Sequence, residues 1–181
     1  MKKYLKSAMV LLTAVLFAGC RPASAPETPA PAAPAPELAE QSEPAGTFDI
    51  PSLDGSGGTV SLSAHAGKVV LLDFWATWCP PCRFELPSLN KLYGELKDRG
   101  FVIIGMTVDQ GSAEKVQPAV AKFGLTYPVG LAGADVQAAY GGIRAVPTKF
   151  LLGKDGQVIE TFVGLVPEEE LRAKIEKALA Q

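Results

Sequence analysis

The strongest constraint on the fold is the segment KVVLLDFWATWCPPCRFELPSL, which runs from Lys68 to Leu89. Its first part is almost continuously apolar, which is typical of a strand covered on both faces. After the cysteines, apolar residues recur at three- and four-residue spacing and predict a helix with one buried stripe. Cys79 and Cys82 therefore lie where a buried strand passes into a helix.

The remaining sequence predicts one domain over residues 46–181. Turn-forming and cap residues divide it into alternating strands and helices. We expect two short strands around a glycine-rich turn in 47–67, strands at 68–76 and 100–109, a hairpin at 148–164, and helices at 80–98, 112–124 and 167–181. Pro87 should bend the first helix, and Ser112 is a plausible N-cap of the second. This order predicts an α/β fold with a mixed central sheet and helices on both faces.

Residues 1–19 predict a signal peptide. Lys2, Lys3 and Lys6 precede an apolar run that is too short to cross a bilayer comfortably. The run ends in LFAGC, which resembles a bacterial lipobox with Phe17 in place of the usual leucine. The resemblance implies cleavage before Cys20 and lipidation of that cysteine. An ordinary secreted protein is the alternative, and both place the domain outside the cytoplasm.

Residues 20–45 are rich in proline and alanine and poor in large apolar side chains. Such a segment cannot bury enough surface to offset the entropy of ordering it, so we expect a linker between the lipidated cysteine and the domain. The formal charge of the chain is −2. Nucleic acid is therefore not an expected partner, because phosphate binding needs a basic surface.

The two cysteines of CPPC can form a disulfide ring. A helix N-terminus favours a thiolate at Cys79, which we expect to be the exposed attacking group, with Cys82 resolving the mixed disulfide. A zinc site would need further ligands, and only Cys20 and His65 remain, so we expect no metal. A structural disulfide closing so short a loop would stabilise little. The pattern predicts a redox-active pair that needs no diffusible cofactor.

FWATWCPPC, together with the acid before it and RAVPT downstream, resembles the thioredoxin-like fold. WCPPCRFELPSL is similar to the extracytoplasmic TlpA/ResA-type branch of thiol–disulfide oxidoreductases, in which a glutamate follows the second cysteine by three residues. The resemblance covers about Phe48 to Leu179. It implies a thioredoxin-like fold and a thiol–disulfide exchange activity.

The resemblance also implies a substrate-binding surface. Pro147 matches the cis-proline that lies beside the cysteines in this family, and the amide of Val146 would bind an extended peptide as an added strand. Trp78 would contact partner proteins. Pro80 and Pro81, between the cysteines, would border the same surface.

Two acids are candidate catalytic residues. Asp73 matches the buried acid of thioredoxin; burial should raise its pKa and let it exchange a proton with Cys82. Its alternative is a structural acid held by an amide or a water. Glu85 should share a helix face with Cys82 and tune its protonation, the alternative being a solvated surface charge. Two acids near the pair disfavour a Cys82 thiolate, as expected of a reducing enzyme.

We therefore expect a membrane-tethered, extracytoplasmic oxidoreductase that reduces disulfides of partner proteins. The resemblance suggests apocytochrome c as one substrate and a membrane thiol reductase as the electron donor. A disulfide-donating oxidase is the main alternative; a peroxiredoxin-type peroxidase and a copper chaperone are weaker ones. The sequence leaves open the direction of exchange, the membrane that holds the anchor and the oligomeric state.

Overall fold

The computed structural model describes residues 46–181, so the predicted signal peptide, Cys20 and the linker lie outside the described residues. The strands are β1 (Asp49–Pro51), β2 (Thr59–Ser61), β3 (Val69–Trp75), β4 (Phe101–Thr107), β5 (Val129–Leu131), β6 (Thr148–Leu152) and β7 (Val158–Val163). The α-helices are α1 (Pro80–Leu96), α2 (Ala113–Phe123), α3 (Ala134–Ala139) and α4 (Glu168–Leu179). Among these helices none is long and apolar enough to cross a membrane.

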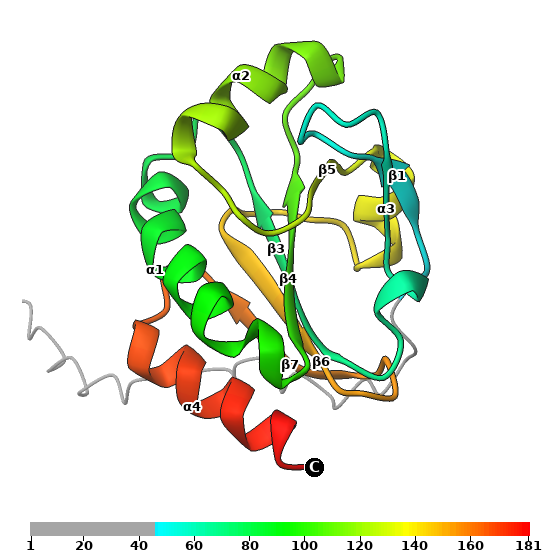
Figure 1. Ribbon diagram of the computed structural model, residues 1–181. Coiled ribbons are helices and arrows are strands. Elements are labelled where there is room, and N and C mark those ends of the chain that lie inside the picture. The colour runs from blue at the N-terminus through cyan, green and yellow to red at the C-terminus, as the bar shows by residue number, and fades with distance from the viewer. Residues whose placement is uncertain (1–45) are drawn as a thin grey trace, which may run out of the picture. The chain divides into compact units, whose positions relative to one another are not determined.

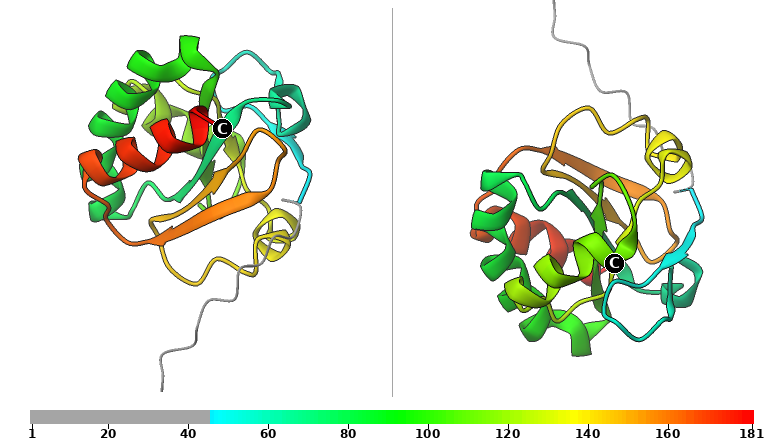
Figure 2. Two further views of the ribbon diagram at one scale, coloured as in Figure 1. Left: turned by 90° about the horizontal axis from the view of Figure 1, so that it is seen from below. Right: turned by 90° about the horizontal axis from the view of Figure 1, so that it is seen from above.

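The central sheet has the strand order β5-β4-β3-β6-β7. β3, β4 and β5 are parallel, whereas β6 and β7 run antiparallel to their neighbours. Helices α1, α2 and α4 lie on one face, and α3 with the β1-β2 hairpin covers the other (Figures 1 and 2). The predicted mixed sheet with helices on both faces is confirmed.

β3 is the central strand and positions the candidate site. All of its residues are buried, as the apolar run predicts. Its side chains alternate: Leu71 and Trp75 face α1, while Leu72 and Phe74 face the hairpin and α3. Burying a leucine or phenylalanine stabilises the fold by about 1.5–3 kcal/mol. Asp73 is two residues from both Leu71 and Trp75, so its side chain points to the same face of the sheet. Its carboxyl therefore lies in the part of the core that α1 covers.

Helix α1 follows β3 almost at once. It begins at Pro80, with Cys79 as its N-cap. Proline suits this position because the first turn of a helix has no partner for its amides. The helix continues through Pro87 to Leu96, close to the predicted end.

The sequence analysis missed β5 and α3. These elements hold three and six residues, too few for a hydrophobic period to be seen. The predicted cap of α2 is half right. Ser112 does hold the N-cap position, but its side chain makes no capping hydrogen bond.

Candidate active site

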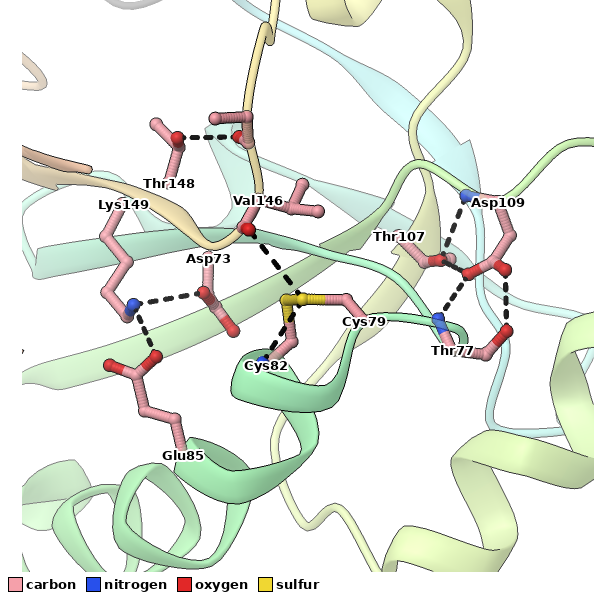
Figure 3. Close-up of a disulfide and its surroundings, with 11 residues drawn as sticks. Asp73, Thr77, Cys79, Cys82, Glu85, Thr107, Asp109, Val146, Thr148 and Lys149 are labelled. Carbon is pink, nitrogen blue, oxygen red and sulfur yellow. Dashed lines mark hydrogen bonds and ion pairs between the residues drawn. A yellow bond between two sulfur atoms is a disulfide. The ribbon is translucent and has the colours of Figure 1, made fainter. Parts of the chain in front are cut away.

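A disulfide joins Cys79 and Cys82 at the start of α1, with an S–S distance of 2.07 Å. The backbone amide of Cys82 donates a hydrogen bond of 3.2 Å to Sγ of Cys79 (Figure 3). The same amide and the positive end of the helix dipole would stabilise a thiolate at Cys79 after reduction. The geometry therefore fits the predicted division between an attacking Cys79 and a resolving Cys82.

The expectation of an exposed Cys79 is wrong. Only 3% of Cys79 and 2% of Cys82 is exposed. The loop before β6 covers the sulfur, since the carbonyl oxygen of Val146 lies 3.7 Å from Sγ of Cys79. Trp78, by contrast, is 64% exposed. The two cysteines are thus covered, whereas Trp78 and Pro80 of this motif are exposed.

The Val146–Pro147 peptide bond is cis, as predicted. Two hydrogen bonds hold this loop: Thr148 Oγ1 donates to the carbonyl of Ala145 at 2.8 Å, and the amide of Gly164 donates to the carbonyl of Pro147 at 2.8 Å. The amide of Val146 makes no backbone hydrogen bond to any residue in 46–181. It is therefore available to pair with an added strand, as the resemblance implies.

Asp73 is buried behind the disulfide, with 1% of its surface exposed. Burial raises the pKa of its carboxyl to about 7; the charge of Lys149 opposes this rise and that of Glu85 adds to it. The predicted direction of the pKa shift is confirmed. In Figure 3 the carboxyl of Asp73 points toward the disulfide from β3.

Glu85 is buried as well, with 5% exposed, so the alternative of a solvated helix charge is wrong. Its position three residues after Cys82 places it on the inward face of α1, as predicted. Oε2 of Glu85 accepts a hydrogen bond of 2.7 Å from Nζ of Lys149. Burial raises the pKa of Glu85, and Lys149 opposes the rise.

Lys149 was missed by the sequence analysis. It is fully buried on β6 and lies opposite Asp73 on β3. Its Nζ is 3.8 Å from Oδ1 of Asp73. A lysine inside an apolar strand was the available signal, because a buried lysine is rare without an acidic partner. The strand register that selects Asp73 as that neighbour cannot be read from the sequence.

Asp109 was also missed, and it holds the turn that leads to Cys79. Its carboxylate accepts hydrogen bonds from the amide and the hydroxyl of Thr77, at 2.9 and 2.6 Å. The hydroxyl of Thr107 donates a further short hydrogen bond to it (Figure 3). The end of β4 is thereby tied to the turn after β3.

The chain is similar to known proteins. The redoxin family model matches residues 31–179. ResA, a thiol-disulfide oxidoreductase of Bacillus thuringiensis, is 37% identical over 125 residues, which is 68% of this chain and 71% of the relative. ResA of Halalkalibacterium halodurans is 37% identical over 133 residues, 73% of each chain.

Solved structures agree with the sequence relatives. A thiol:disulfide interchange protein of the thioredoxin family from Chlorobium tepidum has a TM-score of 0.69 and 30% identity, covering 75% of this chain and 95% of the other. StoA of Bacillus subtilis has a TM-score of 0.61 and 25% identity, covering 73% and 97%. The fold is therefore thioredoxin-like. The chain belongs to the redoxin family, and within it to the ResA/TlpA-type thiol–disulfide oxidoreductases.

Proposed function

We propose that this oxidoreductase reduces disulfides of extracytoplasmic proteins through Cys79 and Cys82. The observation that carries the proposal is a disulfide at the N-terminus of α1, beside the cis-Pro147 loop. In the reduced enzyme, the Cys79 thiolate attacks the target disulfide and one target sulfur leaves as a thiolate. Cys82 loses its proton and attacks Cys79, which releases the second target thiolate and re-forms the enzyme disulfide.

The target would dock as an extended segment. The amide of Val146 is available for a main-chain hydrogen bond, and Trp78 offers exposed apolar area next to Cys79. Pro80 and Pro81, between the two cysteines at the start of α1, would border the same surface. The carbonyl oxygen of Val146 lies 3.7 Å from Sγ of Cys79, so a segment paired with Val146 would lie close to the sulfur that attacks it.

Asp73 and Glu85 support the reducing direction. A buried carboxyl with a pKa raised to about 7 can keep a proton at Asp73 for the Cys82 thiol. Burial also raises the pKa of Glu85. When either carboxyl is ionised, its negative charge disfavours a thiolate at Cys82. An enzyme that does not stabilise its reduced thiolates is a poor oxidant.

The reduction potential tests the direction. We expect a value nearer the about −270 mV of thioredoxin than the about −120 mV of strong periplasmic oxidants. A value near the latter would favour the disulfide-donating alternative. Activity is tested separately: the soluble domain should reduce insulin disulfides with a thiol donor, and Cys79→Ser should abolish the reaction. Full activity of Cys79→Ser would show that another group attacks.

The location and the partners rest on the sequence. A signal peptide at 1–19, lipidation at Cys20 and a linker to residue 45 would tether the domain outside the cytoplasm. Electrons would come from a membrane thiol reductase, and apocytochrome c, with its paired cysteines, would be one substrate. Mixed disulfides trapped on Cys79 would identify the physiological target.

A further inference from the structure

Three ionisable side chains from three elements meet behind the disulfide. Lys149 comes from β6, Asp73 from β3 and Glu85 from α1, and none of the three is more than 5% exposed. The phenol of Tyr127 lies close enough for both carboxylates to raise its pKa further, beyond the effect of burial. Figure 3 shows the ammonium of Lys149 between the two carboxyls, with Asp73 on the side of the disulfide.

This group holds one cation and two acids. An uncompensated charge is costly in a protein interior, and a buried carboxyl without a counter-ion takes up a proton instead. Lys149 can balance only one carboxylate. The group is therefore neutral when one carboxyl is ionised and the other is protonated.

The distances from Nζ of Lys149 to the two carboxyls indicate which one is ionised and which one is protonated. Nζ of Lys149 is 2.7 Å from Oε2 of Glu85, a charge-assisted hydrogen bond. It is 3.8 Å from Oδ1 of Asp73, beyond hydrogen-bonding range. Among the described residues, Oδ1 of Asp73 and Oε1 of Glu85 both lack a hydrogen-bond partner, so the contact with Lys149 is what distinguishes the two acids. Glu85 is thus the carboxylate that Lys149 compensates, and Asp73 is left to carry the proton.

We propose that Lys149 is a positioning residue that holds Glu85 as the carboxylate, so that Asp73 alone exchanges a proton with Cys82. This assignment rests on the proposed dithiol function. Lys149 acts through the two acids and does not touch the reacting sulfurs.

The proton balance follows. When a donor thiolate attacks Cys79 of the oxidised enzyme, the S–S bond breaks and Cys82 leaves as a thiolate, which takes the proton of Asp73. A second donor thiolate then releases Cys79. In the target reaction Cys82 returns its proton to the Asp73 carboxylate and attacks Cys79. Two electrons pass from donor to target, and Asp73 ends protonated as it began.

The test is the titration of the side-chain carboxyls, followed by carbon-13 NMR in the oxidised domain, where the cysteines do not titrate. In the unmodified protein, Glu85 should titrate below Asp73. Lys149→Met removes the cation that lowers the pKa of Asp73, which should then rise by about one unit or more. The pH at which the rate of insulin reduction rises should shift upward by the same amount. Near neutral pH the rate should therefore fall about tenfold.

Two matched variants separate this role from a structural one. Glu85→Gln removes the anion but keeps Lys149, so the pKa of Asp73 should fall. Lys149→Met/Glu85→Gln removes both opposing charges, so the pKa of Asp73 and the pH profile should return to within about half a unit of the original. The double variant also removes both partners of the Lys149–Glu85 ion pair, so it tests the proposal even if Lys149→Met alone fails to fold.

The outcomes are distinct. Asp73 titrating below Glu85, or a double variant that keeps the shifted pH profile, would overturn the assignment. Insulin reduction by the unmodified domain is measured beside these titrations. Its absence would overturn the proposed function, whereas the order in which the two carboxyls titrate is read without any turnover.

Discussion

The amide of Thr77 donates a 2.9 Å hydrogen bond to Oδ2 of Asp109, which ties the turn before Cys79 to the end of β4. The hydroxyl of Thr77 donates to Oδ1 of the same carboxylate. The first cysteine therefore lies between two fixed elements, its helix α1 and a turn bound by a carboxylate from the segment after β4. The hydrogen bonds to Asp109 involve no sulfur atom.

Asp109→Ala should destabilise the domain in both redox states. It leaves a partly buried amide and the hydroxyls of Thr77 and Thr107 without their acceptor, at a cost of about 1–3 kcal/mol in the free energy of unfolding. Denaturant titration of the oxidised and reduced domain measures this. Asp98→Ala, at an exposed position of the turn after α1, is the matched control and should change stability by less than about 0.5 kcal/mol. Equal effects of the two variants would show that the carboxylate does not hold the turn.

Asp73→Asn should change how stability depends on pH. The pKa of Asp73 is raised from 3.8 to about 7 on folding, so the folded state binds a proton more tightly than the unfolded state. The unmodified protein therefore loses stability as pH rises from about 4 to about 7, and the asparagine variant lacks this loss. Relative to the unmodified protein, it should gain roughly 3 kcal/mol between pH 4.5 and pH 7.5.

Denaturant titration of the oxidised forms at these two pH values checks this prediction. Oxidised protein is used because the cysteines then contribute no titration. Glu85 remains in both proteins, so its own contribution largely cancels in the comparison. A difference that stays constant with pH would mean that Asp73 keeps an ordinary pKa.

The sequence could predict Asp73 and Glu85 as site residues, but not that Lys149 lies between them. The acid in the apolar strand and the i, i+3 spacing from Cys82 were both visible, and the structure places both side chains in the interior. Lys149 was not visible as their partner, because the pairing of β3 with β6 depends on a register between segments far apart in the chain. The burial of Cys79 was unpredictable for a similar reason, since a distant loop at Val146 covers it.

Trp78→Ala should weaken the binding of protein substrates without harming the fold. The side chain is 64% exposed, so it contributes little to stability, but it offers apolar area beside the disulfide. Exposed tryptophans at interfaces are often worth 1–2 kcal/mol or more, so we expect KM for insulin to rise about 5- to 30-fold. The rate with a small aromatic disulfide should stay nearly unchanged.

Ile159→Ala is the control for Trp78. Ile159 is 45% exposed on β7 and lies beside Gly153, at the turn end of the β6-β7 hairpin. Its loss should leave KM for insulin unaltered. If both variants raise KM alike, the effect would not be specific to the tryptophan beside Cys79.

Cys82→Ser should trap target proteins on Cys79. The attacking sulfur and its hydrogen bond from the amide at position 82 remain, but the second sulfur that breaks the mixed disulfide is gone. Non-reducing gels of cells that express the full chain should show higher-mass species that collapse on reduction. The double variant Cys79→Ser/Cys82→Ser should show none. Species that persist in the double variant would come from Cys20 instead.

Cys20→Ser should release the protein from the membrane. The apolar run before Cys20 is too short to span a bilayer comfortably, so membrane association should depend on lipid at that cysteine rather than on the run itself. Fractionation of cells that express the full chain should move the variant from the membrane to the soluble fraction, with insulin-reducing activity retained because residues 46–181 are unchanged. Cys82→Ser, which leaves residues 1–20 unchanged, should stay with the membrane. Continued membrane association of Cys20→Ser would argue for an uncleaved leader or a protein partner as the anchor.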